Sequence, residues 1–203
     1  FAIWTSKIRY LGVGAMLIGG IWALVSMRGS LISGIKSGLR SHHIDAGTAY
    51  DHRQHDTPMK FVLWGTAALV VPIFFLFQVI VGTLGVALAM TVIMVITGFL
   101  FSSVAAYMAG LVGSSNNPIS GITIATILFT SLLLAWLMGD DTASGPAAAI
   151  MVGAVVCCAA AIAGDNLQDL KAGFLVGATP WRQQLMQGVG VVSAVLVIAP
   201  ILN

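Results

Sequence analysis

Residues 61–112 form an almost uninterrupted apolar run, broken only at Gly82-Thr83-Leu84-Gly85. The run holds about 50 residues, whereas about 20 helical residues already cross the hydrocarbon core of a bilayer. We therefore expect a turn at 82–85 between two membrane-spanning helices. Stretches that are long enough to cross or nearly cross a bilayer occur at 10–27, 61–81, 83–112, 119–138, 146–163 and 185–203.

The composition agrees with a membrane protein. Hydrophobic residues make up 58% of the chain, charged residues only 8%, and there is no Glu. Soluble domains usually carry about 25% charged residues, which form the polar shell around the core. We therefore predict an all-α, polytopic transmembrane helical bundle with about six spans, with the lipid bilayer as its surroundings. No basic helix or aromatic-rich basic patch suggests a nucleic-acid partner.

The charges between the apolar stretches predict the orientation. If the spans alternate in direction, 28–60, 113–118 and 164–184 share one side of the membrane. That side would hold Arg28, Lys36, Arg40, Arg53, Lys60, Lys171 and Arg182, and the other side only Lys7 and Arg9. The positive-inside rule then predicts that 28–60 is a polar cytoplasmic loop.

The whole chain, 1–203, reads as a single transmembrane domain. It begins at Phe1 without a Met, and it stops directly after a long apolar run. We therefore expect it to be an internal piece of a longer protein whose remaining helices complete the bundle.

A polar cluster interrupts the apolar sequence at LVGSSNNPISGITIATI, residues 111–127. Pro118 has no N–H and disfavours helical geometry at Asn117, so we expect the chain to unwind near 114–118 and to restart a helix at 119–121. One interpretation is a broken or re-entrant segment near 114–121, which survives at membrane depth only inside protein or against a water-filled cavity. The other is a short cytoplasmic turn with Asn caps between two ordinary spans.

A second polar cluster lies in AGDNLQDLKAGFLVGATPWRQQ, residues 163–184. Asp165 and Asp169 are four residues apart on one helical face and repel each other, an arrangement that can serve a proton carrier. Lys171 could instead neutralise one of them. Alternatively, Asp165 is a helix N-cap with Gln168 as its capping-box partner. The Gly173–Gly177 GxxxG pattern indicates close helix packing.

All four His residues lie in SHHIDAGTAYDHRQHD, residues 41–56. His52 and His55 are spaced so that they could share a helix face as metal ligands, but no Cys or Glu accompanies them. We therefore expect a solvated loop, with no metal site and no cofactor.

Residues 107–130 and 163–184 closely resemble the oligopeptide transporter (OPT) superfamily in its prokaryotic branch. The segments RYLGVGAMLIGGIWAL (9–24) and DTPMKFVLWG (56–65) are similar to the same branch, in the same order. One departure is Ala172, where members commonly carry Thr before the glycine, so no hydroxyl role is expected there.

The resemblance implies a secondary transporter of bacterial or archaeal inner membranes that imports small peptides together with protons. In related branches the substrate is a metal–chelate complex. The implied residues of the substrate pathway are Asn116, Asn117, Pro118, Ser120 and Gly121. The implied coupling or gating residues are Asp165, Asn166, Gln168, Asp169 and Lys171.

The sequence leaves two other classes of function open, and neither is favoured. A membrane-embedded hydrolase would need a nucleophile–base pair or a metal set at membrane depth, yet every His lies outside the predicted spans. A passive channel or structural subunit would tolerate changes to the polar clusters. We therefore predict that the chain is not an enzyme.

Overall fold

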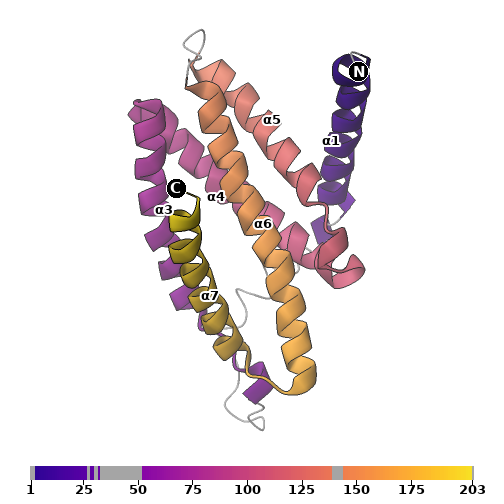
Figure 1. Ribbon diagram of the computed structural model, residues 1–203, viewed down its shortest axis with the longest axis vertical. Coiled ribbons are helices and arrows are strands. Elements are labelled where there is room, and N and C mark those ends of the chain that lie inside the picture. Colours follow the sequence, from indigo (N-terminus) through magenta and orange to yellow (C-terminus); the bar gives the residue numbers. More distant parts are fainter. Residues whose placement is uncertain (1–2, 27, 30–31, 33–51, 139–143, 203) are drawn as a thin grey trace.

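The computed structural model describes residues 3–26, 28–29, 32, 52–138 and 144–202. Within these ranges the regular structure is entirely helical (Figure 1). The long helices are α1 (Arg9–Ser26), α3 (Met59–Val81), α4 (Leu84–Val112), α5 (Ile119–Met138), α6 (Gly145–Val176) and α7 (Pro180–Ile201). Short turns of π or 3-10 helix lie at Trp4–Ile8, His52–Gln54 and Ser114–Asn116.

Each predicted apolar stretch coincides with one of the long helices, which confirms the all-α bundle. By length and composition, α3, α4, α5 and α6 are able to cross a membrane. Helices α1 and α7 coincide with the first and last predicted stretches, and their passage through the bilayer stays a prediction. Most of the predicted polar loop, residues 33–51, lies outside the described residues.

The break in the long apolar run is a turn at Gly82 and Thr83. Gly82 has φ 74°, a left-handed conformation that glycine adopts without strain, and its N–H bonds to the carbonyl of Gln78. Thr83 is extended and precedes the first residue of α4. The predicted turn is therefore confirmed, although Leu84 and Gly85 already belong to α4.

Helix α6 is longer than its apolar sequence predicts. The predicted span ends at residue 163, but the helix continues to Val176 and ends at Gly177, which has φ 82°. Main-chain hydrogen bonds do not depend on apolar side chains, so the polar residues from Asp165 onward extend the helix. The interpretation of Asp165 as an N-cap is therefore wrong, because no helix begins there. The next helix, α7, begins at Pro180, a residue that is common at the first position of a helix.

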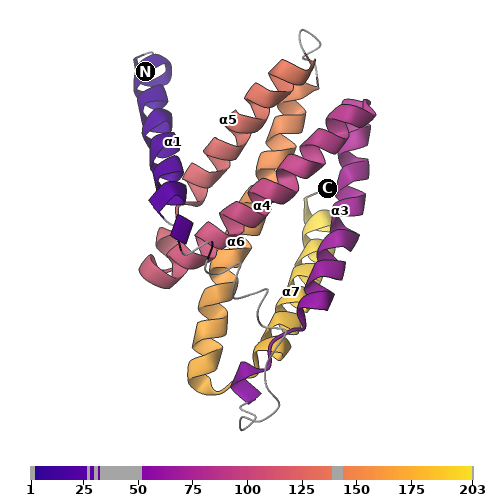
Figure 2. The same ribbon diagram turned by 180° about the vertical axis from the view of Figure 1, so that it is seen from behind.

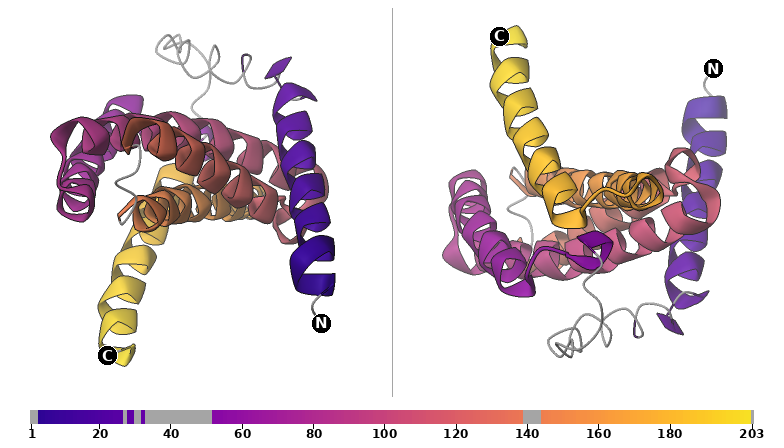
Figure 3. Two further views of the ribbon diagram at one scale, coloured as in Figure 1. Left: turned by 90° about the horizontal axis from the view of Figure 1, so that it is seen from above. Right: turned by 90° about the horizontal axis from the view of Figure 1, so that it is seen from below.

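The core forms where α4 and α5 pack against α6 (Figure 2), and Phe77 of α3 also belongs to it. Met90 of α4, Ile122 of α5, and Val152 and Val156 of α6 are almost fully buried. Seen from above and below, α7 points away from the other helices (Figure 3). Large apolar side chains remain exposed on the outside, including Trp64 and Val79 of α3, as expected for helices that meet lipid or further helices.

Candidate functional site

The polar connection between α4 and α5 has the geometry that the sequence predicts. Gly113, with φ 85°, follows the last residue of α4, and its N–H bonds to the carbonyl of Ala109 at 3.0 Å. A single 3-10 turn, Ser114–Asn116, leads to Asn117, whose extended backbone (φ −68°, ψ 133°) suits a residue before proline. Helix α5 begins at Ile119. The predicted interruption at 114–118 and restart at 119 are therefore confirmed.

The side chain of Asn117 joins this turn to two helices. Its Nδ2 donates a hydrogen bond to the carbonyl of Ala105 in α4 at 3.0 Å. The same amide group lies against Gly164 of α6, where a Cβ atom would overlap with Nδ2. Gly164 is therefore required as glycine for the amide to reach this position.

A second contact holds the turn to α6. The backbone N–H of Ser114 donates to Oε1 of Gln168 at 3.2 Å. Helix α6 continues for eight residues beyond Gln168, which corresponds to about 12 Å of helix. The α4–α5 turn thus packs on the side of α6, not at its end, and the structure brings together two polar clusters that the sequence presents separately.

The remaining residues of the first cluster differ in exposure. Pro118 is half-buried, Gly121 is buried in α5, and Asn116 and Ser120 are exposed. The Nδ2 atom of Asn116 donates to the carbonyl of Val112 at 3.4 Å, so Asn116 caps the last turn of α4. This cap fits the interpretation as a turn, whereas the docking of Asn117 on the side of α6 fits the interpretation as a broken segment inside the bundle.

The charged residues Asp165, Asp169 and Lys171 of the second cluster lie in the C-terminal part of α6. Asp165 and Asp169 are exposed in this chain and lie about one helical turn apart. Lys171 lies over the ring of Phe174, with 5.4 Å from Nζ to the ring centroid, and it forms no ion pair within the described part of the chain. The suggested neutralisation of an aspartate by Lys171 is therefore not seen. Asp169 instead accepts a hydrogen bond from Nε2 of Gln187 in α7 at 3.2 Å.

A side chain of α7 also packs closely against α6, at Gly173. The side-chain amide of Gln183 occupies the space that a Cβ atom of Gly173 would need. The other glycine of the GxxxG pattern, Gly177, forms the left-handed turn after α6. The pattern therefore indicates one close contact and one turn. Sequence reasoning missed Gln183 and Gln187, although two glutamines four residues apart at the start of an apolar helix are a usable signal.

Residues 52–57 meet the turn between α6 and α7 (Figure 1). His52 Nε2 lies 3.1 Å from the carbonyl oxygen of Gly177, and the N–H of Trp181 donates to the carbonyl of His55 at 3.3 Å. No group of three or more potential metal ligands occurs within the described ranges. His42 and His43 lie outside them.

Three buried amide oxygens of the two clusters and of α7 lack a hydrogen-bond partner in the described part of the chain. They are Oδ1 of Asn117, Oδ1 of Asn166 and Oε1 of Gln183. Buried amide oxygens normally accept a hydrogen bond. These acceptors are therefore suited to water, further helices or a polar solute.

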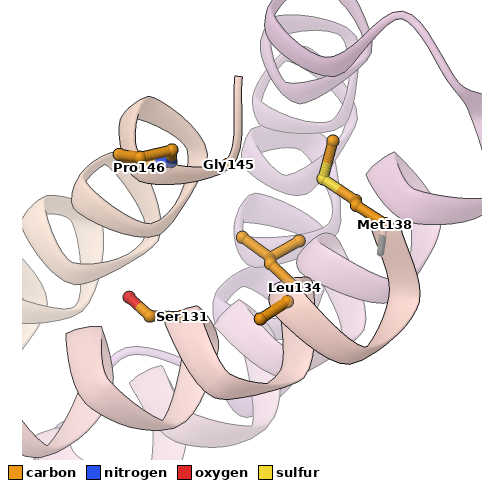
Figure 4. Close-up of a pocket in the computed structure, with 6 residues that line it drawn as sticks. Ser131, Leu134, Met138, Gly145 and Pro146 are labelled. Atoms are coloured by element: carbon orange, nitrogen blue, oxygen red, sulfur yellow. The ribbon is translucent and has the colours of Figure 1, made fainter. Parts of the chain in front are cut away.

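An apolar pocket lies elsewhere, between the end of α5 and the start of α6 (Figure 4). It has a volume of about 200 Å³ and is lined by Ser131, Leu134, Ala135, Met138, Gly145 and Pro146. None of the predicted site residues lines it, so it is separate from the polar clusters.

Comparison with known proteins identifies the family. A family model described as "OPT oligopeptide transporter protein" matches residues 1–203. A Haemophilus influenzae protein named "Putative oligopeptide transporter" is 35% identical over 223 aligned residues, which cover 99% of this chain and 34% of that protein. The chain thus spans about a third of the length of this relative, and no solved structure matches it.

Helices long and apolar enough to cross a membrane, together with this match, place the chain in an integral, multi-pass membrane protein. Because the family model covers the chain from end to end, the chain belongs to the OPT oligopeptide transporter family.

Proposed function

We propose that the chain is part of a secondary active transporter that imports small oligopeptides together with protons. The observation that carries this proposal is the family match over residues 1–203, supported by the name of the Haemophilus influenzae relative. The proposed mechanism includes no covalent chemistry, so the proposal describes a transporter and not an enzyme.

The substrate pathway of the proposal runs past the α4–α5 turn. A peptide carries amide groups and charged termini, and it needs both donors and acceptors along its path. Asn116, Asn117, Pro118, Ser120 and Gly121 form or flank the turn. The buried Oδ1 of Asn117 supplies a free acceptor there within the described residues.

Proton coupling is assigned to the C-terminal part of α6. Asp165 and Asp169 are the acidic residues of the helices α3 to α7. Asn166, Gln168 and Lys171 surround them in sequence, and Gln168 contacts the α4–α5 turn directly. A change in the charge of α6 can therefore act on the turn through this hydrogen bond.

In the proposed cycle, substrate and proton bind near the broken segment, and one part of the bundle then rocks against the other. The hydrogen bond between Ser114 and Gln168 joins the α4–α5 turn to the part of α6 that carries the carboxylates. It gives the coupling a short physical route.

The test is uptake by proteoliposomes that contain the full-length protein. They receive a labelled mixture of short peptides and an inward proton gradient, with a protonophore as control. Accumulation that depends on the gradient supports the proposal. A folded protein that accumulates labelled metal–chelate complexes in place of peptides would assign it the other substrate class of the superfamily.

Two variants test whether Asp169 is a carboxylate that couples transport to protons. Asp169→Asn keeps the shape and the hydrogen bond with Gln187 but removes the charge, so we expect gradient-driven accumulation to be lost. Gln187→Leu keeps the charge and removes the hydrogen bond, so we expect accumulation to be reduced but still gradient-dependent. Full accumulation by folded Asp169→Asn protein would remove Asp169 from the coupling machinery.

A further inference from the structure

Polar contacts tie the segment that leads into α3 to the start of α7. The Nε2 atom of Gln184 donates to Oδ1 of Asp56 at 2.7 Å, and the hydroxyl of Thr57 donates to Oε1 of Gln184. The contacts of His52 with Gly177 and of His55 with Trp181 lie beside them. We call the residues His52, His55, Asp56, Thr57, Gly177, Trp181 and Gln184 the clasp.

The clasp joins parts of the chain that are about 125 residues apart in sequence. Thr57 lies two residues before α3, and Gln184 lies in the first turns of α7. The described parts of the two segments predicted to share one side of the membrane thus meet at one end of the bundle. Away from this end α7 points outward, and residues 188–198 are exposed (Figure 3).

The clasp differs in kind from the core contacts of the bundle. Ile122, Val152 and Val156 interlock in an apolar core that excludes water. The hydrogen bonds of Asp56 and His52, in contrast, lie at exposed positions. Exposed hydrogen bonds exchange readily with water, so they open at little net cost.

We propose that the clasp is a gate contact, which closes the end of the bundle between α3 and α7 and opens in each transport cycle. The inference rests on the proposed function, because a gate presupposes alternating access. Helices α3, α4, α5 and α6 move as one unit through their shared core, to which Phe77 of α3 contributes. The segment 52–57 and the first turns of α7 separate when the clasp opens.

The test uses the full-length protein with M59C and L185C, two exposed positions beside the clasp, in a background without other cysteines that includes C157A and C158A. Spin labels at the two positions report their separation in proteoliposomes, with and without a proton gradient and labelled peptides. We expect a short and a long distance population whose ratio changes with the gradient. A single short distance under every condition would overturn the proposal. This measurement does not depend on uptake.

Reversible crosslinking tests whether opening is needed. A separate variant, T57C/Q184C in the same background, is joined by a short, reducible bifunctional thiol reagent, and uptake is measured before and after reduction. The control pair is I127C/G153C, because a Cβ on Gly153 would lie 3.7 Å from Cβ of Ile127, a separation that suits a direct disulfide. It locks α5 to α6 inside the core.

We expect peptide uptake to fall about tenfold or more when the clasp is crosslinked and to recover on reduction. Uptake by the oxidised control should stay within about twofold of the parent. Unchanged uptake with the clasp crosslinked would overturn the gate. If the parent and the reduced variant both accumulate no peptide, the proposed function is wrong. The spin-label distances then decide on the clasp alone. Size-exclusion profiles confirm that each variant is folded, and Gln184→Leu, which leaves Asp56 and Thr57 without their partner, should enlarge the long-distance population.

Discussion

The side-chain amide of Asn117 lies directly against the backbone of Gly164, in the space where any other residue would carry its Cβ atom. This contact places the α4–α5 turn on the side of α6. It also explains why a buried position in the middle of a long helix is a glycine, although glycine is unfavourable there.

Gly164→Ala should therefore destabilise the full-length protein. The added methyl overlaps with Nδ2 of Asn117, and overpacking of this kind costs about 1–3 kcal/mol. Thermal unfolding in detergent measures the effect. The matched control is Gly110→Ala in α4, where a Cβ would meet only Cδ2 of Leu167 at 3.8 Å. Equal stability of the two variants would show that the notch at Gly164 is not filled by the amide.

Substitutions of Asn117 test the hydrogen bond itself. Asn117→Ala removes the donor to the carbonyl of Ala105 and should cost about 0.5–1.5 kcal/mol. Asn117→Asp keeps the shape of the side chain, but it replaces the donor with a carboxylate oxygen that cannot donate to that carbonyl. Its loss of stability should therefore be larger. We expect the thermal unfolding midpoint to be highest for the parent, lower for Asn117→Ala and lowest for Asn117→Asp. If Asn117→Asp were as stable as the parent, Nδ2 of Asn117 would not donate to the carbonyl of Ala105 in the full-length protein.

The helix boundaries around this site could be predicted because they depend on local chemistry. Pro118 and Gly113 fix the interruption between α4 and α5, and Gly82 fixes the turn after α3. The end of α6 was missed because hydropathy marks where a helix leaves an apolar environment, not where its hydrogen bonds stop. Gly177, which ends α6, followed by Pro180, which begins α7, was the better signal.

The pairing of the polar residues could not be predicted. Asn117 meets Gly164, Gln183 meets Gly173, and Gln184 meets Asp56, yet each pair depends on which helices pack together and in which register. A single sequence gives the polarity of a residue but not its partner across the bundle. The residues Gln183, Gln184 and Gln187 were overlooked for this reason.

A double-mutant cycle tests the contact at Gly173, where the side-chain amide of Gln183 packs against a second glycine of α6. Gly173→Ala should lower the stability of the full-length protein, because the methyl collides with the amide of Gln183. In a Gln183→Ala background the same change should cost less, with a coupling of about 0.5–3 kcal/mol, as residues in contact show. The measurement is thermal unfolding of the parent, the two single variants and the double variant. Additive effects would contradict the contact.

Two threonines of α5 allow a matched test of burial. Thr126 and Thr130 are both almost fully buried, at 1% and 0% exposure. The hydroxyl of Thr126 donates to the carbonyl of Ile122 at 2.8 Å, whereas Oγ1 of Thr130 has no partner within the described residues. Removing a buried hydroxyl that lacks a partner relieves a desolvation cost of about 1–3 kcal/mol, so Thr130→Val should leave stability unchanged or raise it.

Thr126→Val should in contrast lower stability slightly, since it removes a made hydrogen bond of about 0.5–1.5 kcal/mol. Thermal unfolding of the two variants side by side distinguishes the cases, because the change in volume is the same. A loss of stability from Thr130→Val as large as that from Thr126→Val would mean that Oγ1 of Thr130 is hydrogen-bonded in the full-length protein. The interior of α5 would then contain a water or a contact from another helix, and the buried face of α5 would be part of a larger polar network.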